Sequence, residues 1–103
     1  MIHVIATLKV DPARRAEFLT AFRELTPKVL AEEGCLQYVA ATDTPTSIAA
    51  QQLAGEDTVM VVEKWSSVAA LEAHLDAPHM HAFREQSAEM TRGVTLQVLK
   101  PFE

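Results

Sequence analysis

A glutamate, a tryptophan and two histidines lie close together in the segment VVEKWSSVAALEAHLDAPHM, which spans residues 61–80. Glu63 and Trp65 are two residues apart, so on a β-strand their side chains share one face. His74 and His79 follow in stretches with helical spacing. Imidazole and carboxylate groups are the side chains that most often exchange protons in proteins. The residue types therefore suit proton-transfer chemistry, provided that the fold brings them together.

Glu63 and Trp65 can be placed on the predicted strand over 58–66. Their face also carries Val59 and Val61, and an ionised carboxylate among valines needs hydrogen bonds or a partner charge. The alternative is a glutamate at the strand end that is half exposed to solvent. Trp65 likewise has an alternative role, which is simple packing in the core.

His74 lies at the edge of the buried stripe of its predicted helix. Val68, Leu71 and Leu75 centre that stripe, and at about 100° per residue His74 is about 90° from its centre. His74 can therefore point inward to a pocket at the sheet or rest at the rim.

The last predicted helix separates His79 from His81. The first lies beside the inward stripe and the second about 160° away from the first, so these two side chains cannot share one metal ion. We therefore expect no metal site. The inward stripe consists of Met80, Phe83, Ser87 and Met90.

The hydrophobic period changes several times along the chain. Alternation at residues 2–10 predicts a strand, and Asp11-Pro12 has the pattern of a helix start. Gly34 is typical of the residue just beyond a helix end. The predicted elements are a strand over 2–10, a helix between Asp11 and Gly34, strands over 36–42 and 58–66 separated by a loop or an irregular edge strand over 43–57, helices over 68–75 and 79–90, and a strand over 94–99.

This order of elements matches the split βαβ arrangement of a ferredoxin-like α+β domain with an antiparallel sheet. The predicted strands over 2–10 and 58–66 are apolar in the middle on both faces. Helices can cover only one face of a sheet, so a second sheet should cover the other, most simply in a symmetric homodimer.

Composition restricts the partners and the compartment. The chain of 103 residues is 49% hydrophobic, which predicts one domain over residues 1–103. Nine basic and fourteen acidic residues give a net charge of −5, which argues against nucleic acid and anionic membranes as partners. The start of the chain has no signal-peptide pattern. Cys35 is the only cysteine, and we expect it to be a buried apolar residue in a cytoplasmic protein.

Three motifs together resemble the antibiotic-biosynthesis monooxygenase family, and within it the small bacterial quinol monooxygenases. They are E-x-W-x-S-x-x-x-L-x-x-H-x-x-x-P-H-M at 63–80, E-E-G-C-x-x-Y at 32–38, and V-I-A in the first strand. The resemblance extends from Ile2 to Pro101 and is weakest over 43–55. It implies a dimeric α/β barrel and an oxygenase that uses O₂ without metal, flavin or haem. The haem-degrading members carry an asparagine in the first strand, and IHVIATLKV has none.

The resemblance also implies roles for particular residues. A deprotonated quinol can pass electrons directly to O₂, so His74 would be the proton acceptor, and Glu63 would orient it or stabilise its charged form. Trp65, Tyr38, His79 and Phe83 would bind the substrate, a quinol or a similar small aromatic. A non-enzymatic dimeric ligand-binding or stress-response module of the same fold is an alternative, as is an isomerase of a small metabolite.

Overall fold

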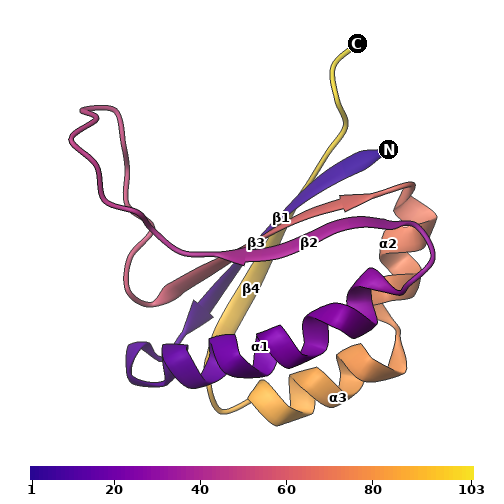
Figure 1. Ribbon diagram of the computed structural model, residues 1–103, viewed down its shortest axis with the longest axis horizontal. Coiled ribbons are helices and arrows are strands. Elements are labelled where there is room, and N and C mark those ends of the chain that lie inside the picture. The colour runs from indigo at the N-terminus through magenta and orange to yellow at the C-terminus, as the bar shows by residue number, and fades with distance from the viewer.

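Four antiparallel strands form one sheet in the computed structural model, which describes residues 1–103. The strand order is β2-β3-β1-β4, so the first and third strands are central (Figure 1). This order confirms the predicted ferredoxin-like α+β fold with its split βαβ connection. The strands are β1 (Ile2–Val10), β2 (Cys35–Ala41), β3 (Thr58–Trp65) and β4 (Thr91–Leu99).

Three α-helices, α1 (Arg15–Leu30), α2 (Val68–Leu75) and α3 (Pro78–Ser87), connect these strands. Side chains cap the N-terminal ends of the 3₁₀ turn before α1 and of α2. Asp11 accepts a hydrogen bond from the Ala13 N–H at 3.0 Å, before a 3₁₀ turn that leads into α1, and Ser67 accepts one from the Ala70 N–H at 3.1 Å. None of the three helices is both long enough and apolar enough to cross a lipid bilayer.

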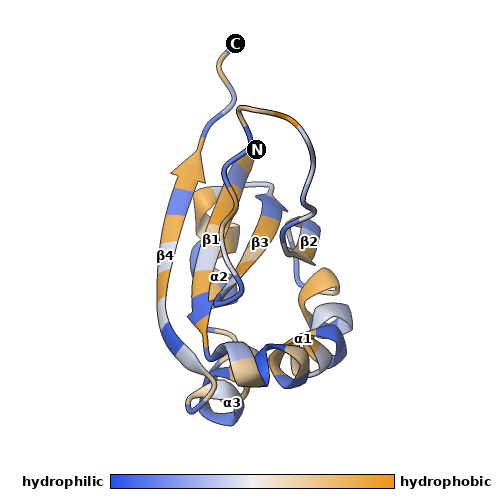
Figure 2. Cartoon of the chain, turned by 90° about the vertical axis from the view of Figure 1, so that its left-hand side faces the viewer, coloured by the Kyte–Doolittle hydropathy of each residue, from blue (hydrophilic) through white to orange (hydrophobic).

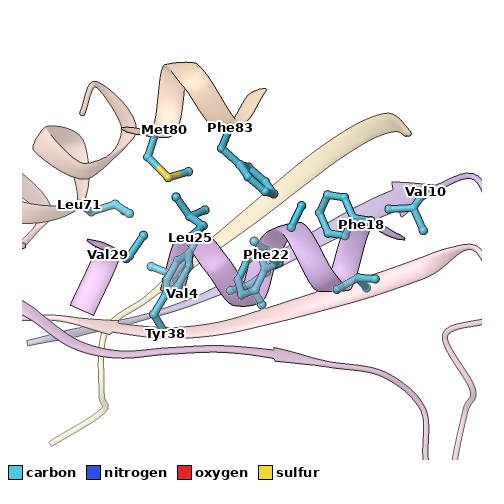
Figure 3. Close-up of a cluster of buried hydrophobic side chains, with 14 of the residues drawn as sticks. Val4, Val10, Phe18, Phe22, Leu25, Val29, Tyr38, Leu71, Met80 and Phe83 are labelled. Carbon is cyan, nitrogen blue, oxygen red and sulfur yellow. The ribbon is translucent and has the colours of Figure 1, made fainter. Parts of the chain in front are cut away.

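The core lies between the sheet and the helices α1 and α3 (Figure 3). Three phenylalanine rings join the two helices, and the Phe18 and Phe83 ring centroids are 5.6 Å apart. Phe22 stacks on Tyr38 of β2 with a centroid separation of 5.2 Å. Aromatic rings therefore join α1 to α3 and α1 to β2.

The helix-facing side of β4 is left open. Val98 pairs with Val4, Leu96 with Ala6 and Val94 with Leu8, and directly opposed residues of antiparallel strands point to the same side of a sheet. Val4 and Ala6 are buried, yet Val94, Leu96 and Val98 are 60%, 42% and 48% exposed. Figure 2 shows this alternation of apolar residues along the edge strand.

The other side of the sheet, which we call the outer face, is apolar in its middle. Val39, Val62 and Ile5 lie side by side across β2, β3 and β1. Val39 is 50% exposed and the other two are half-buried. The two-sided apolar character that the sequence predicts for the central strands is therefore present.

Two boundaries differ from expectation at the end of the chain. The last helix ends at Ser87 instead of near residue 90, and β4 begins at Thr91 instead of Val94. The Met90 N–H bonds to the Ser87 carbonyl at 2.9 Å, which closes a tight turn. Val10 of β1 can then pair with Thr91, so β4 begins three residues before the predicted start at Val94.

The segment 42–57 contains no helix or strand, so the predicted loop is confirmed, the alternative of an irregular edge strand is wrong, and the strand before it ends at Ala41. It projects from the sheet in Figure 1, and polar contacts hold it in shape. The two carboxylate oxygens of Asp43 accept hydrogen bonds from the N–H groups of Ala54 and Gly55 at 2.9 and 2.8 Å. The ends of the loop are therefore tied to each other.

Candidate functional site

Glu63 and Trp65 lie on the helix-facing side of β3, as their spacing predicts. Trp65 is fully buried, and its indole Nε1–H donates a 2.9 Å hydrogen bond to Oε1 of Glu63. Glu63 is only 5% exposed, so the alternative of a half-exposed glutamate at the strand end is wrong. Both side chains project toward the region where α2 and α3 meet the sheet.

His74 is buried at 1% exposure, so the rim position is wrong and the inward position is right. Its ring contacts two aromatic side chains. The ring centroids of Trp65 and Tyr38 are 4.6 and 5.3 Å from that of His74. These contacts therefore restrict rotation of the His74 ring.

The carboxylate bonded to His74 is Glu32, in place of the expected Glu63. Nδ1 of His74 is 2.9 and 3.2 Å from the two Glu32 oxygens. Nε2 of His79 is 2.6 Å from Oε2 of the same carboxylate. An ionised carboxylate only accepts hydrogen bonds, so both nitrogens carry their protons toward Glu32. That tautomer leaves a lone pair on Nε2 of His74.

Glu32 occupies a turn between α1 and β2 that is held at both ends. Its N–H bonds to the Val29 carbonyl, and its own carbonyl accepts from the Cys35 N–H. Gly34 adopts a φ of +83°, and a Cβ there would lie 2.5 Å from Oγ of Ser66. Because only glycine fits this close approach, the turn sits against the start of α2 and directs Glu32 toward His74.

A cavity of about 460 Å³ lies between the sheet and α3, beside this cluster. Ten of its sixteen lining residues are hydrophobic, which is typical of a site for a small organic molecule. Among the six candidate residues, His74, Glu63, Tyr38 and Phe83 line the cavity. Trp65 and His79 do not line it. The first lies behind Glu63 and His74, and the second behind Glu32.

Three of the candidate residues on the cavity wall each keep a polar atom that has no hydrogen-bond partner in the protein. These atoms are Oε2 of Glu63, Nε2 of His74 and the hydroxyl of Tyr38. No side-chain nitrogen or oxygen in the chain is both sealed from solvent and unpaired, so each of these atoms keeps some accessible surface. A ligand in the cavity can therefore meet polar groups of three candidate residues, together with Arg84, Ser87 and Thr91, within a mostly apolar wall.

The surroundings of the cavity shift the pKa of each polar group. Burial raises the pKa of Glu63 to about 7, the hydrogen bond from Trp65 opposes this, and the negative charge of Glu32 adds to it. Burial lowers the pKa of His74, against the hydrogen bond and charge of Glu32. Burial raises the pKa of Tyr38. Near pH 7 the cavity thus offers a neutral imidazole, a carboxyl that can give or take a proton, and a phenol that donates.

His81 is separate from this cluster, as the helical geometry predicts. Its Nε2 is 3.0 Å from Oδ1 of Asp76, and its side chain is 60% exposed. No group of three or more His, Cys, Asp or Glu side chains is arranged to hold a metal ion.

Glu32 is the site residue that sequence reasoning missed. It stands in the E-E-G-C motif, but a glutamate in a turn after a helix is usually solvated. The available signal was Gly34 two residues later, because a glycine at a helix end fixes the direction of the chain that precedes it.

Known proteins resemble the chain in sequence and in structure. Residues 1–86 match the family described as antibiotic biosynthesis monooxygenase. The Escherichia coli (strain K12) protein named "Probable quinol monooxygenase YgiN" is 35% identical over 103 residues, which cover 98% of each chain. The crystal structure of PA3566 from Pseudomonas aeruginosa has a TM-score of 0.80 at 24% identity and covers 99% of this chain and 94% of that one. The structure of Rv0793 from Mycobacterium tuberculosis has a TM-score of 0.78 at 25% identity, with 99% and 95% covered. The shared fold and the sequence matches agree with the motifs at 32–38 and 63–80, and this chain belongs to the antibiotic biosynthesis monooxygenase family.

Proposed function

We propose that the protein is a cofactor-independent monooxygenase that oxidises a quinol, or a similar small aromatic, with O₂. The observation that carries the proposal is the set of three free polar atoms, from Glu63, His74 and Tyr38, on the wall of an apolar cavity. Family membership and the likeness to a protein named a quinol monooxygenase support the same chemistry.

Each cavity residue has a role in this reaction. The quinol hydroxyl gives its proton to Nε2 of His74, which Glu32 orients from behind. The quinolate oxygen is then stabilised by the Tyr38 hydroxyl and by Glu63 in its protonated form, which donate hydrogen bonds in a site with little water. Phe83 packs against the ring, and Trp65 holds Glu63 and His74 in place.

The electron-rich quinolate reduces O₂ directly. One oxygen atom enters the ring, where a C–H bond becomes C–OH, and the other leaves as water, so a hydroquinone becomes a hydroxyquinone. The quinol loses four electrons in total, and O₂ gains four. The protein supplies proton transfer, orientation and exclusion of water, and the substrate supplies the electrons.

We also propose that the working form is a homodimer. The apolar outer face and the open side of β4 would be covered by a second copy, which would also narrow the mouth of the cavity near Val94 and Leu96. Two sheets packed on each other would give the α/β barrel that the resemblance implies.

Oxygen uptake by the purified protein, treated exhaustively with EDTA, tests the proposal. A panel of benzohydroquinones, naphthohydroquinones and catechols is assayed with autoxidation subtracted, and ¹⁸O₂ shows whether oxygen enters the ring. We expect uptake above the blank, ¹⁸O in the product, and no loss after chelation. Uptake that yields only unlabelled quinone and H₂O₂ would indicate an oxidase. Binding of quinol without uptake would support the non-enzymatic ligand-binding module.

A further inference from the structure

We propose that Glu32 is a positioning residue for the oxidation, because its carboxylate fixes the ring orientation and tautomer of His74, and that His79 holds this carboxylate in place. The inference rests on the proposed function, in which His74 accepts the proton. It assigns His79 a role behind the cavity, in place of direct contact with the substrate.

The geometry of the cluster supports this assignment. One carboxylate joins the turn after α1 to α2 and α3, through residues that are 42 and 47 positions away in the sequence. The side chain of Glu32 is 14% exposed and that of His74 is 2% exposed, so little water competes for these hydrogen bonds. Charge-assisted bonds of this kind are short and strong, and they select one geometry.

Without Glu32, nothing else in the structure bonds to Nδ1 of His74. A neutral imidazole could then carry its proton on Nε2, which would leave no lone pair toward the cavity. The carboxylate thus keeps the lone pair on the atom that faces the substrate. Catalytic triads use the same principle, in which a buried carboxylate orients the base and stabilises its charged form.

His79 restrains Glu32 from the solvent side. Its side chain is 22% exposed, and its Nε2 lies 2.6 Å from Oε2 of Glu32. The ring projects from the first turn of α3, which Pro78 starts, so its position follows from a rigid element. This bond leaves the Glu32 carboxylate fewer orientations in which it can release His74.

Other charged and titratable groups also act on His74. Arg84 of α3 and His79 lower its pKa, and Glu32 raises it. Tyr38 is in ring contact from β2, and Glu63 bonds to the Trp65 ring that packs on His74. Among these groups only Glu32 bonds to the imidazole, so its removal has a specific effect on the pKa.

The test compares Glu32→Gln and His79→Asn with a matched pair on the surface. His81 and Asp76 form a second histidine–carboxylate contact at 3.0 Å, with side chains 60% and 88% exposed. His81→Ala and Asp76→Asn therefore control for the loss of an imidazole or a carboxylate. Steady-state rates are measured with the quinol that the wild type oxidises fastest, across pH 5 to 9. Nitrogen-15 chemical shifts of the His74 ring report its tautomer in the resting protein.

We expect Glu32→Gln to lower kcat by roughly 10²-fold with less than about a threefold change in KM, because the substrate does not touch Glu32. The acidic limb of the pH profile should move to lower pH, since the carboxylate that raises the pKa of His74 is gone. His79→Asn should lower kcat by about tenfold. Both surface variants should behave as wild type. The Nδ1–H tautomer should predominate in the wild type and lose its predominance in Glu32→Gln.

Two results would overturn the inference. One is an unchanged tautomer and pH profile in Glu32→Gln. The other is an equal loss of kcat in the surface pair. If Glu32→Gln does not fold, the same measurements on His79→Asn, which changes a partly exposed residue, test the inference: kcat, the pH profile and the nitrogen-15 shifts of His74. A wild type that oxidises no quinol would instead count against the proposed function, and the nitrogen-15 shifts would still show whether Glu32 sets the tautomer.

Discussion

The indole N–H of Trp65 donates a 2.9 Å hydrogen bond to Oε1 of Glu63, two residues earlier on the same strand. Both side chains are buried, so the bond forms away from bulk water. It favours the ionised form of Glu63, whose pKa burial nevertheless raises to about 7. The tryptophan of this motif therefore modulates the charge of a carboxyl group on the cavity wall.

Trp65→Phe should lower the free energy of unfolding most at high pH, because ionised Glu63 then loses its only hydrogen-bond donor. A hydrogen bond to a charged group contributes about 2 kcal/mol to stability. Urea denaturation of Trp65→Phe, Glu63→Leu and the double variant gives the coupling energy, because leucine has no acceptor for the indole N–H. We expect about 2 kcal/mol at pH 8.5 and less at pH 5.5, where Glu63 is protonated. A coupling energy that does not depend on pH would contradict the role of the indole N–H.

Glu63 should make the free energy of unfolding fall as the pH rises. Its pKa is about 7 in the folded protein and has the ordinary value of 4.5 in the unfolded chain. Below pH 4.5 both states bind the proton, and between 4.5 and 7 only the folded state keeps it, so stability is lost over this window. The loss is on the order of 3 kcal/mol. The difference in free energy of unfolding between wild type and Glu63→Gln, measured by denaturation from pH 4 to 9, should fall over this window. A difference that does not change with pH would mean that the pKa of Glu63 is not raised in the folded protein.

His74→Ala should lower turnover by roughly 10²-fold or more, because general-base catalysis typically supplies a factor of 10² to 10⁴. His81→Ala removes an imidazole from the neighbouring helix at an exposed position and should change little. The two variants are compared at saturating quinol near pH 7, after circular dichroism and sedimentation confirm the fold and assembly of each. Equal rates in both variants would exclude His74 as the base.

Val39→Glu should convert the proposed homodimer to a monomer. Val39 lies on the outer face and is 50% exposed in the single chain, so the fold tolerates a charge there, but a dimer interface would not. Leu30→Glu is the matched control, since Leu30 is also 50% exposed but lies at the end of α1. Sedimentation equilibrium at micromolar concentration gives the mass of each variant. A wild-type monomer, or dimers in both variants, would contradict the proposal.

The sequence predicts most of the fold because local pattern and tertiary structure agree. The period of two places Glu63 and Trp65 on the helix-facing side, and Met80, Phe83 and Ser87 of the last helix are buried as the helical period requires. The predicted start of β4 at Val94 is wrong because Thr91 belongs to the strand only through its pairing with Val10. Local periodicity does not encode that contact.

The candidate site was predicted less completely than the fold, and for a related reason. The helical period places His74 relative to its own helix and the sheet, but Glu32 approaches it from the turn after α1. A carboxylate 42 residues away in the sequence leaves no periodic signal. The roles of Tyr38, His79 and Phe83 came from the family resemblance and stay predictions.

The hydrogen bonds of Glu32 also have a consequence for the order of folding. They close chain segments of 42 and 47 residues, so their formation carries a loop-closure cost that local contacts do not. The three helices and the pairing of β2 with β3, in which Ala41 pairs with Met60, need only contacts between nearby residues and can form earlier, without the imidazole being aligned. A partly folded chain would thus contain helices and one strand pair before it contains an oriented base. During refolding, recovery of quinol oxidation should therefore lag behind recovery of the far-ultraviolet circular dichroism signal.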